Sequence, residues 1–268
     1  MRDIATAQPA SIILDSQLHS QPSEKRPANV LGVIPARLAS TRLARKVLRI
    51  IAGRPMLAWV YEAANTCPQL DRVVIATDSD EVAELCRQNN WPVQLTSADL
   101  PSGTDRVHAI AQQIPADIYV NIQGDEPLLK PEHLTALLRP FTHLQVEVST
   151  LKVLCTPENI ANPNAVKVVT AADGRALYFS RATIPYDRDA RIGNAPQYWK
   201  HIGLYAYRKS ALLRFPTLPP SALEQTERLE QLRFLENGID IHVEPTDFDT
   251  IGVDTEEDLH RVEALLRR

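Results

Sequence analysis

Short apolar runs alternate with amphipathic stretches through the first half of the chain. Three continuous apolar runs, of the kind that forms parallel strands buried on both faces, span residues 29–35, 72–77 and 117–123. Residues 55–67 carry apolar side chains at helical spacing, the acidic residues of 78–81 suit the first turn of a second helix, and a third helix is predicted after Pro131. Strands that alternate with helices in this way predict an α/β fold with a mostly parallel sheet.

The chain from about residue 146 to 215 follows a different pattern. Apolar segments that are each predicted to be a strand occupy residues 146–154, 165–170, 176–180 and 199–207. Asp173-Gly174 lies between the second and third segments and is a strong hairpin signal. These strands are therefore expected to form an antiparallel subdomain, inserted into the parallel sheet or appended to it.

The last part of the chain returns to helices and a strand. Helices are predicted over residues 224–236 and 255–266, with a strand over 239–243 between them. Asn237-Gly238 suits the C-cap of the first helix. Thr255 and Asp258 have the spacing of a capping box at the start of the last helix.

Residues 1–29 differ from the remainder of the chain. They are polar and contain prolines, with one short apolar patch at residues 12–14. The basic start, longer apolar stretch and small-residue cleavage site of a signal peptide are missing. We expect a flexible N-terminal tail, with a packed arm or a targeting segment as the alternative, followed by one folded domain over residues 30–268.

Composition and charge narrow the classes of protein to consider. Of 268 residues, 44% are hydrophobic and 23% are charged, a globular balance that excludes a disordered, collagen-like or coiled-coil chain. No apolar run approaches the roughly 18–20 residues of a membrane-spanning helix, so membrane insertion is not expected. The net charge of −4 gives no sign of nucleic-acid binding, so an anionic ligand must be bound by a local cluster of Arg and Lys. Three scattered cysteines support neither a disulfide framework nor a zinc site, and the cytoplasm is the expected compartment.

A basic loop follows the first predicted strand. Its cationic and hydroxyl side chains are Arg37, Arg42, Arg45, Lys46, Ser40 and Thr41. Ligands bind at the carboxyl ends of strands in open parallel sheets, where cations and backbone N–H groups together suit a polyphosphate. The GxxxxGK[ST] pattern of a Walker loop is absent. A solvated basic loop without a ligand is the alternative.

Acidic residues lie at two further ends of predicted strands. Asp125 and Glu126 follow the third strand beside Gly124, and Asp254 stands between the last strand and the last helix. Carboxylates so placed can hold Mg²⁺, a hard ion that prefers one or two carboxylates together with substrate oxygens. A plain turn after the third strand and a helix N-cap at Asp254 are the structural alternatives. Sequence spacing does not decide whether the two carboxylates meet.

Nine segments of the chain carry a family resemblance. They read VIPARLASTRL, ATDSDEV, SGTDRV, VNIQGDEPL, NPNAVKVV, ALYFSRATIPYDRD, KHIGLYAYR, LEQTERLEQLRFLENG and GVDTEEDLHRV, in this order. From Val30 to its end, the chain resembles the 3-deoxy-manno-octulosonate cytidylyltransferases (CMP-Kdo synthetases). The resemblance implies a Rossmann-like nucleotidyltransferase sheet. It also implies transfer of CMP from CTP to the anomeric 2-hydroxyl of 3-deoxy-D-manno-octulosonate (Kdo), with release of pyrophosphate, Mg²⁺ as cofactor and a role in lipopolysaccharide biosynthesis.

The same resemblance implies roles for individual residues. CTP would be bound by Ala36, Arg37, Ser40, Lys46, Ser102 and Gly103, and Mg²⁺ by Asp125 and Asp254. The sugar acid would contact Gln123, Arg181, His201, Tyr205, Glu230 and Gln231. The catalytic set would be Arg37, Lys46, Asp125 and Asp254, with no separate side-chain base, because the metal ion would acidify the attacking hydroxyl. Packing is the alternative role for His201, Tyr205 and Glu230, and Arg106 is open between a ligand contact and an ion pair.

One segment departs from the family pattern. Where the family usually reads RLPGKPL, this chain has Arg42-Leu43-Ala44-Arg45-Lys46-Val47-Leu48. The change removes a rigid residue and a residue that tolerates positive φ, while Lys46 stays in register. The geometry of the CTP-binding loop is therefore in question.

The resemblance also bears on partners and on competing functions. A homodimer is expected, in which the antiparallel region supplies both an interface and the acceptor pocket. A related sugar acid such as 8-amino-Kdo is the alternative acceptor. A catalytically silent nucleotide- or sugar-acid-binding regulator is the alternative class, and it would be marked by loss of Asp125, Asp254 or Lys46, all of which are present.

Overall fold

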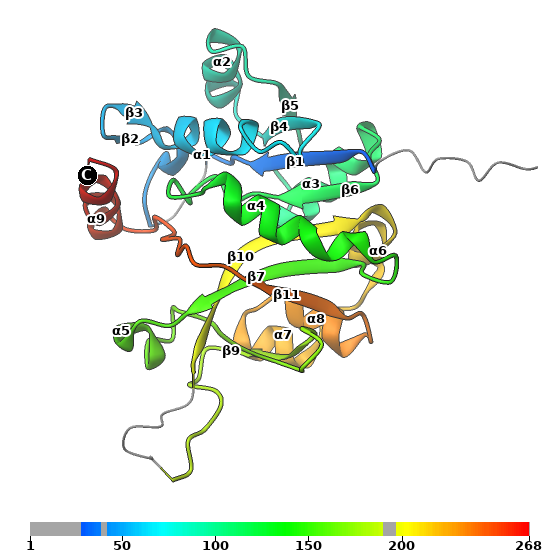
Figure 1. The fold of residues 1–268 in the computed structure, drawn as a ribbon. Helices are drawn as coiled ribbons and strands as arrows, with labels where there is room; N and C mark the ends of the chain where they lie inside the picture. The colour runs from blue at the N-terminus through cyan, green and yellow to red at the C-terminus, as the bar shows by residue number, and fades with distance from the viewer. Residues whose placement is uncertain (1–27, 39–41, 190–196, 268) are drawn as a thin grey trace, which may run out of the picture.

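The main sheet of the computed structural model has a parallel half and an antiparallel half (Figure 1). The structure describes residues 28–38, 42–189 and 197–267. The strands of this sheet are β1 (Val30–Pro35), β4 (Arg72–Thr77), β5 (Val93–Leu95), β6 (Ile118–Asn121), β7 (Val148–Leu154), β8 (Lys167–Thr170), β9 (Ala176–Ser180), β10 (Trp199–Arg208) and β11 (Ile241–Pro245). Their order is β11-β7-β10-β6-β1-β4-β5, and the β8–β9 hairpin joins β10.

Strand β10 runs opposite to both of its neighbours in the strand order. Strand β1 runs parallel to β4 and β6, and β4 runs parallel to β5, as the apolar runs predict. Strand β10 is antiparallel to both β6 and β7, and β11 is parallel to β7. The α/β class is confirmed, and the antiparallel strands expected within residues 146–215 continue the parallel sheet.

Helices cover both faces of this sheet, and side chains of β1 are buried under the helices on each face. Ile34 belongs to a core shared with α1 (Met56–Asn65), α2 (Asp80–Gln88) and α4 (Pro131–Leu138). Leu31 and Val33 belong to a core shared with α3 (Gly103–Gln113), α6 (Lys209–Arg214) and α8 (Gln231–Glu236). The remaining elements are η1 (Lys46–Leu48), β2 (Ile50–Ile51), β3 (Arg54–Pro55), η2 (Arg139–Thr142), α5 (Pro157–Ile160), η3 (Phe215–Thr217), α7 (Ala222–Glu227) and α9 (Glu256–Leu266).

A third, smaller core fixes the C-terminal helix. Val253 and the apolar face of α9 pack on Leu43 of the basic loop, on Ile51 of β2 and on Met56. This packing brings the end of the chain back to the residues that follow β1, and it matters for the site described below.

The prediction of one helix over residues 224–236 is wrong. The chain forms α7 and α8, because Arg228 adopts the left-handed conformation with a φ of 56° and ends α7. The strand predicted at 239–243 begins two residues later, at Ile241.

Several terminal signals are confirmed. Thr255 and Asp258 form the capping box of α9. Asn237 is the C-cap of α8 and is followed by Gly238 at a φ of 72°, and Gly174 in the hairpin has a φ of 87°. Capping residues therefore predicted correctly where these elements end, whereas hydrophobic periodicity did not predict that the helix over residues 224–236 is interrupted.

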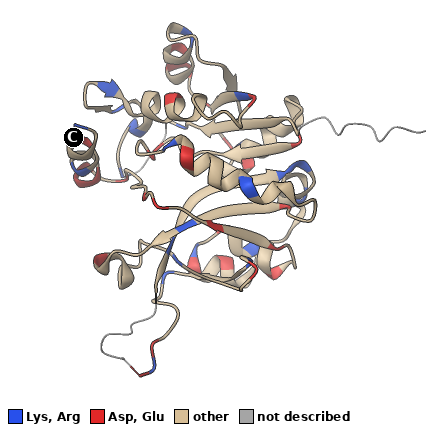
Figure 2. Cartoon of the chain, in the orientation of Figure 1, with Lys and Arg blue, Asp and Glu red and all other residues tan. Residues whose placement is uncertain are grey.

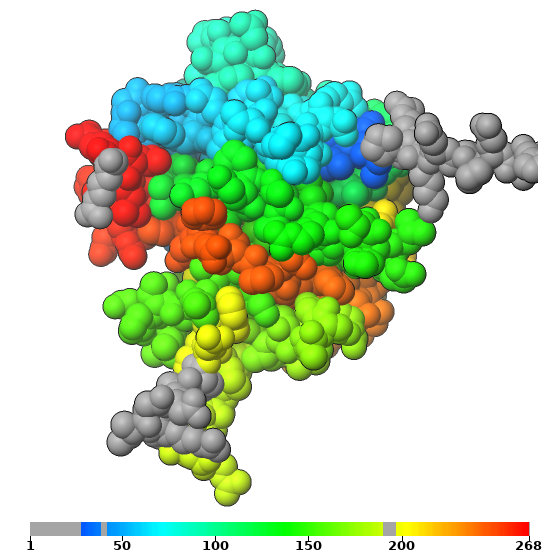
Figure 3. All heavy atoms as spheres, in the orientation of Figure 1, coloured from blue at the N-terminus to red at the C-terminus, as the bar shows by residue number. Residues whose placement is uncertain are grey.

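The predicted N-terminal tail lies outside the described residues as far as residue 27. Asn29 already belongs to the fold, since its N–H donates to the Asp117 carboxylate at 2.8 Å and its carbonyl accepts from the Asp117 N–H at 2.9 Å. Residues 182–189, which follow β9, project from the body of the molecule (Figure 3). Basic and acidic residues are interspersed along the ribbon in Figure 2. In the part of the chain that the structure describes, no helix has the length and apolarity to cross a membrane.

Candidate functional site

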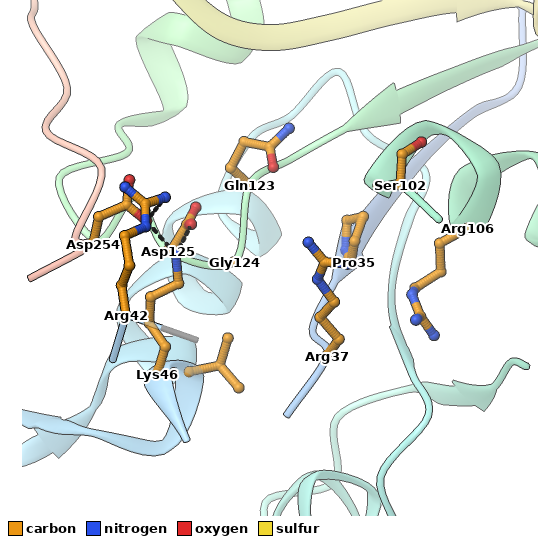
Figure 4. A pocket seen from close by; sticks show the side chains of 12 residues that line it. Pro35, Arg37, Arg42, Lys46, Ser102, Arg106, Gln123, Gly124, Asp125 and Asp254 are labelled. Carbon is orange, nitrogen blue, oxygen red and sulfur yellow. Dashed lines mark hydrogen bonds and ion pairs between the residues drawn. The ribbon is translucent and has the colours of Figure 1, made fainter. Parts of the chain in front are cut away.

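A cavity of about 560 Å³ opens at the carboxyl ends of β1 and β6 (Figure 4). Its lining comes from the end of β1, the basic loop, the start of α3, the turn after β6 and the segment before α9. The lining residues are Pro35, Arg37, Arg42, Lys46, Val47, Ser102, Gly103, Arg106, Gln123, Gly124, Asp125 and Asp254. The cavity therefore lies where open parallel sheets bind ligands.

Three cations of the basic loop, Arg37, Arg42 and Lys46, reach this cavity. Ala36 anchors the loop to the sheet, because its N–H donates to the Ala76 carbonyl at 2.8 Å and its carbonyl accepts from the Thr77 hydroxyl at 2.6 Å. The predicted CTP ligand Ser40 lies outside the described residues.

Arg45 stands at the position of the family's glycine. It adopts a left-handed conformation with a φ of 55° and a ψ of 35°, which glycine adopts without strain. Its guanidinium pairs with Glu81 in the first turn of α2. Lys46, the next residue, still reaches the cavity.

The two acids predicted to meet do so at one ammonium group. Lys46 Nζ donates to Asp125 Oδ2 at 2.5 Å and to Asp254 Oδ1 at 2.9 Å, and Arg42 Nη2 lies 3.0 Å from the same Asp254 oxygen. In Figure 4 these four side chains form one side of the cavity, with Ser102 on the other. Burial acts to lower the pKa of Lys46, but the two carboxylates outweigh it and the pKa is raised.

Local structure explains why both carboxylates face this point. A Cβ on Gly124 would lie 2.8 Å from the Pro35 carbonyl, so only glycine lets the turn after β6 pass so close to the end of β1. The Val253 N–H donates to the Asp125 carbonyl at 2.9 Å and ties the two acidic segments together. Thr255 is the N-cap of α9, which leaves the side chain of Asp254 free of the capping role considered above.

The donor set suits magnesium rather than a softer metal. Two carboxylates from distant parts of the chain converge, and a cluster of three or more His, Cys, Asp or Glu side chains is not found among the described residues. One or two carboxylates completed by phosphate oxygens and water is the usual protein environment of Mg²⁺.

The start of α3 forms the opposite wall. Ser102 caps the helix by accepting from the Asp105 N–H at 3.2 Å, and Gly103 follows it. Arg106, only 1% exposed, forms an ion pair with Asp78 at 3.1 Å, so the structure shows the ion pair that sequence reasoning left open. The sequence patterns did not predict α3 as a helix, although the Ser-x-x-Asp spacing at its start was a usable signal.

Three of the predicted acceptor residues lie on or against β10. His201 and Tyr205 are buried with their ring centres 5.4 Å apart, and Gln123 donates to the Gly203 carbonyl at 3.2 Å. Burial lowers the pKa of His201 to about 3, so its imidazole is neutral, and its Nε2 lies 3.0 Å from the Thr150 hydroxyl.

Four buried polar atoms in this region have no hydrogen-bond partner within the described ranges: the Tyr205 hydroxyl, Gln231 Nε2, Asn121 Oδ1 and Glu126 Oε2. Asn121 is the partner of Tyr205 across β6 and β10, and Gln231 is the first residue of α8. Buried polar groups are normally paired, so such groups are explained by a polar ligand or by water. Glu230, just before Gln231, accepts from the Thr104 hydroxyl at 3.1 Å and joins α8 to the start of α3.

Arg181 is placed differently from the other predicted acceptor residues. Its guanidinium donates to the carbonyls of Glu227, Pro163 and Arg228 at 2.8, 3.0 and 3.4 Å. These bonds hold the break between α7 and α8. Of the predicted acceptor residues, Gln123 lines the cavity described above, whereas Arg181, His201, Tyr205, Glu230 and Gln231 do not. In this structure, the Arg181 side chain therefore stabilises the turn between α7 and α8.

Fold, cavity and sequence comparisons together define the class of protein. The cytidylyltransferase family profile matches residues 31–241, so the chain belongs to the cytidylyltransferases. It is 69% identical over 240 residues to a 3-deoxy-manno-octulosonate cytidylyltransferase of Acidobacterium capsulatum, covering 89% of this chain and 96% of that protein. It is 60% identical to the Koribacter versatilis protein of the same name, covering 88% and 90%. The chain is thus a member of the 3-deoxy-manno-octulosonate cytidylyltransferase family.

Solved structures agree with this assignment. A CMP:2-keto-3-deoxy-manno-octonic acid synthetase complexed with CTP superposes with a TM-score of 0.86 at 39% identity, covering 90% of this chain and 99% of that one. A 4-diphosphocytidyl-2C-methyl-D-erythritol synthase of Anaerococcus prevotii, at 12% identity and a TM-score of 0.63, shares the fold.

Proposed function

We propose that this chain transfers CMP from CTP to the anomeric hydroxyl of Kdo, giving CMP-Kdo and pyrophosphate for lipopolysaccharide biosynthesis. The observation that carries the proposal is the convergence of Asp125 and Asp254 on Lys46 beside a basic loop. The high identity to named 3-deoxy-manno-octulosonate cytidylyltransferases supports the choice of substrates.

The cavity suits a nucleoside triphosphate. Arg37, Arg42 and Lys46 would neutralise the triphosphate, and Ser102 and Gly103 at the start of α3 would lie beside the nucleoside. Lys46 would turn its ammonium from the two carboxylates to a phosphate oxygen when the nucleotide binds. CTP binding would therefore free Asp125 and Asp254 for a cation.

Catalysis would depend on positioning and charge neutralisation. The anomeric oxygen attacks the α-phosphorus, the bond from the α-phosphorus to the oxygen that bridges to the β-phosphate breaks, pyrophosphate leaves with that electron pair, and the hydroxyl proton passes to solvent. Asp125 and Asp254 would hold Mg²⁺, which when bound polarises the phosphoryl group and lowers the pKa of the attacking hydroxyl. No side-chain base is required in this scheme.

The buried polar groups of the antiparallel half would bind the polyhydroxylated acceptor. The Tyr205 hydroxyl and the Gln231 Nε2 have no hydrogen-bond partner among the described protein atoms, and the neutral imidazole of His201 lies beside the Tyr205 ring. Gln123 would lie between acceptor and nucleotide, since it lines the cavity and contacts Gly203 of β10. Arg181 would act by holding the α7–α8 turn that presents Glu230 and Gln231.

Pyrophosphate release from CTP tests the proposal. The purified protein is assayed with Kdo, 8-amino-Kdo and an acylneuraminate, each with Mg²⁺ and with EDTA. We expect release with Kdo and Mg²⁺, and none with EDTA. Release only with 8-amino-Kdo would move the acceptor to that sugar acid. CTP binding without release from any acceptor would instead support a silent regulator.

We also propose a cytoplasmic homodimer. CTP and other nucleotide substrates are made in the cytoplasm, which supports the compartment. Leu177 on β9 is 61% exposed and Tyr186 in the projecting segment is 86% exposed, so the antiparallel half presents apolar side chains to a second copy. Sedimentation equilibrium of the wild-type protein, beside Leu177→Asp, tests this: a dimer that the substitution weakens is expected, and a monomeric wild type contradicts it.

A further inference from the structure

The segment that carries Asp254 has no regular structure of its own. Residues 246–255, which we call the strap, join β11 to α9 and form neither a helix nor a strand, although the Thr246 N–H at its start donates to the Lys152 carbonyl of β7 at 2.9 Å. The position of the Asp254 carboxylate is therefore set by contacts that the strap makes with other elements.

Lys200 of β10 supplies a polar anchor in the middle of the strap, beside the contact of 2.9 Å between His133 Nε2 of α4 and the Phe248 carbonyl. Its Nζ donates to Asp249 Oδ1 at 2.7 Å and to the Thr250 carbonyl at 2.8 Å. The Lys200 side chain is 17% exposed, and Thr250 is 3% exposed. A bond between partly buried charged groups constrains geometry more than an exposed ion pair does, because fewer water molecules compete for it.

The anchored point is linked onward to the other carboxylate. The carboxylate of Glu126, which adjoins Asp125, is buried; burial raises its pKa, and Thr250 and Lys200 both act to lower it. Further along the strap, the Val253 N–H bonds to the Asp125 carbonyl. Lys200 thus holds the middle of the strap, and Val253 holds its end against the turn after β6.

Lys200 also belongs to the acceptor side of the molecule. It immediately precedes His201, and β10 carries Tyr205 further along. One side chain therefore joins the strand that would bind the sugar acid to the strap that carries Asp254.

We propose that Lys200 is a positioning residue, which sets the place of the Asp254 carboxylate relative to the acceptor strand through Asp249 and Thr250. The inference rests on the proposed function. It assigns to Lys200 no contact with substrate. Loss of its ammonium would let the strap shift and would weaken cation binding and turnover, while the CTP-binding loop on β1 stays intact.

The test compares Lys200→Met with a matched lysine. Lys152 on β7 is also half-buried, but its Nζ bonds to Thr170 at 2.7 Å and lies over the Trp199 ring, with no side-chain contact to the strap. Lys152→Met is therefore the control for loss of a partly buried ammonium in the same half of the sheet.

Two readouts separate positioning from general destabilisation. Mn²⁺ binding, measured by electron paramagnetic resonance with the unreactive α,β-methylene analogue of CTP, should weaken by about tenfold in Lys200→Met, the lower end of effects from residues that orient metal ligands. Steady-state kinetics should show a similar fall in kcat with less than about a threefold change in KM for CTP. Lys152→Met should leave Mn²⁺ affinity unchanged.

Asp249→Asn provides a second route if Lys200→Met does not fold, since it removes the ion pair at a more exposed side chain. It should weaken Mn²⁺ binding in the same direction but less, because the bond to the Thr250 carbonyl remains. Unchanged Mn²⁺ affinity in either folded variant overturns the inference. A wild-type protein that binds Mn²⁺ with the analogue but never releases pyrophosphate would defeat the proposed function and leave this comparison valid.

Discussion

Replacing Lys46 by methionine should change metal binding and catalysis in opposite directions. Without nucleotide, the Lys46 ammonium occupies the point between Asp125 and Asp254 where a divalent cation would sit. The substitution removes this competitor, so Mn²⁺ should bind the nucleotide-free protein more tightly. Turnover should fall, because the same ammonium would neutralise the triphosphate.

The size of the effect follows from the geometry. The two carboxylate oxygens lie 2.5 and 2.9 Å from one nitrogen, so they are at most about 5.4 Å apart. Two like charges at that separation repel by about 3 kcal/mol at an effective dielectric constant of about 20. The carboxylate side chains are 29% and 38% exposed, and Arg42 remains beside Asp254. Solvent and Arg42 therefore screen the repulsion, and we expect about half of this energy to remain. About 1.4 kcal/mol corresponds to a tenfold change in Mn²⁺ affinity.

The assay is a Mn²⁺ titration of nucleotide-free protein followed by electron paramagnetic resonance. Urea unfolding in EDTA should show the variant destabilised by about 1–2 kcal/mol, with Mg²⁺ restoring most of the loss. Arg87→Met, which removes an exposed cation paired within α2, controls for the change in net charge. Equal or weaker Mn²⁺ binding by Lys46→Met would refute the reasoning that the ammonium and the metal compete.

Three further outcomes are expected. Between pH 7 and pH 5 the free energy of unfolding of the wild type should fall by about 2 kcal/mol relative to His201→Gln. The reason is that His201 takes up a proton near pH 6.5 in the unfolded state, whereas the buried imidazole, with a pKa of about 3, does not. Urea unfolding of both proteins at both pH values measures this difference. Arg45→Gly should change the free energy of unfolding by less than about 1 kcal/mol, because relief of the left-handed strain and loss of an exposed ion pair offset each other. KM for CTP should change by less than about threefold. A larger rise in KM would show that Arg45 contacts the nucleotide. Removal of residues 1–27 should leave pyrophosphate release within a few-fold of wild type, and a collapse of solubility or turnover would show that this segment packs.

Sequence patterns predicted the parallel half of the fold because its signals are local. The run from Val30 to Pro35 is buried on both faces and needs no distant partner to be recognised as a strand. The capping box at Thr255 likewise depends on residues three apart. Local chemistry of this kind survives in any tertiary context.

The break between α7 and α8 could not be found in the same way. The residues around Arg228 favour a helix, and the left-handed turn is held from a distance: Arg181 bonds to the carbonyls of Glu227 and Arg228, and the Glu227 carboxylate bonds to Ser180 and to the Arg181 N–H. Long-range hydrogen bonds here override helix propensity.

The sequence could not predict that the Asp125 and Asp254 carboxylates meet, for a related reason. Residue types and strand ends marked Asp125 and Asp254 as candidates, but their approach depends on packing of α9 against the basic loop. The role of Lys200 was not anticipated, because its partners are a strap carbonyl and an acid almost fifty residues away.

The central claim is that Asp125 and Asp254 act on one bound cation, and the turnover of the double variant tests it most directly. Asp125→Ala and Asp254→Ala should each lower kcat by on the order of 10², the scale of one lost electrostatic stabiliser. If both hold the same ion, the double variant should be within about tenfold of the worse single variant, since the site is already lost. A double variant slowed by about the product of the two single effects, or a single variant with near-normal kcat, would contradict the account.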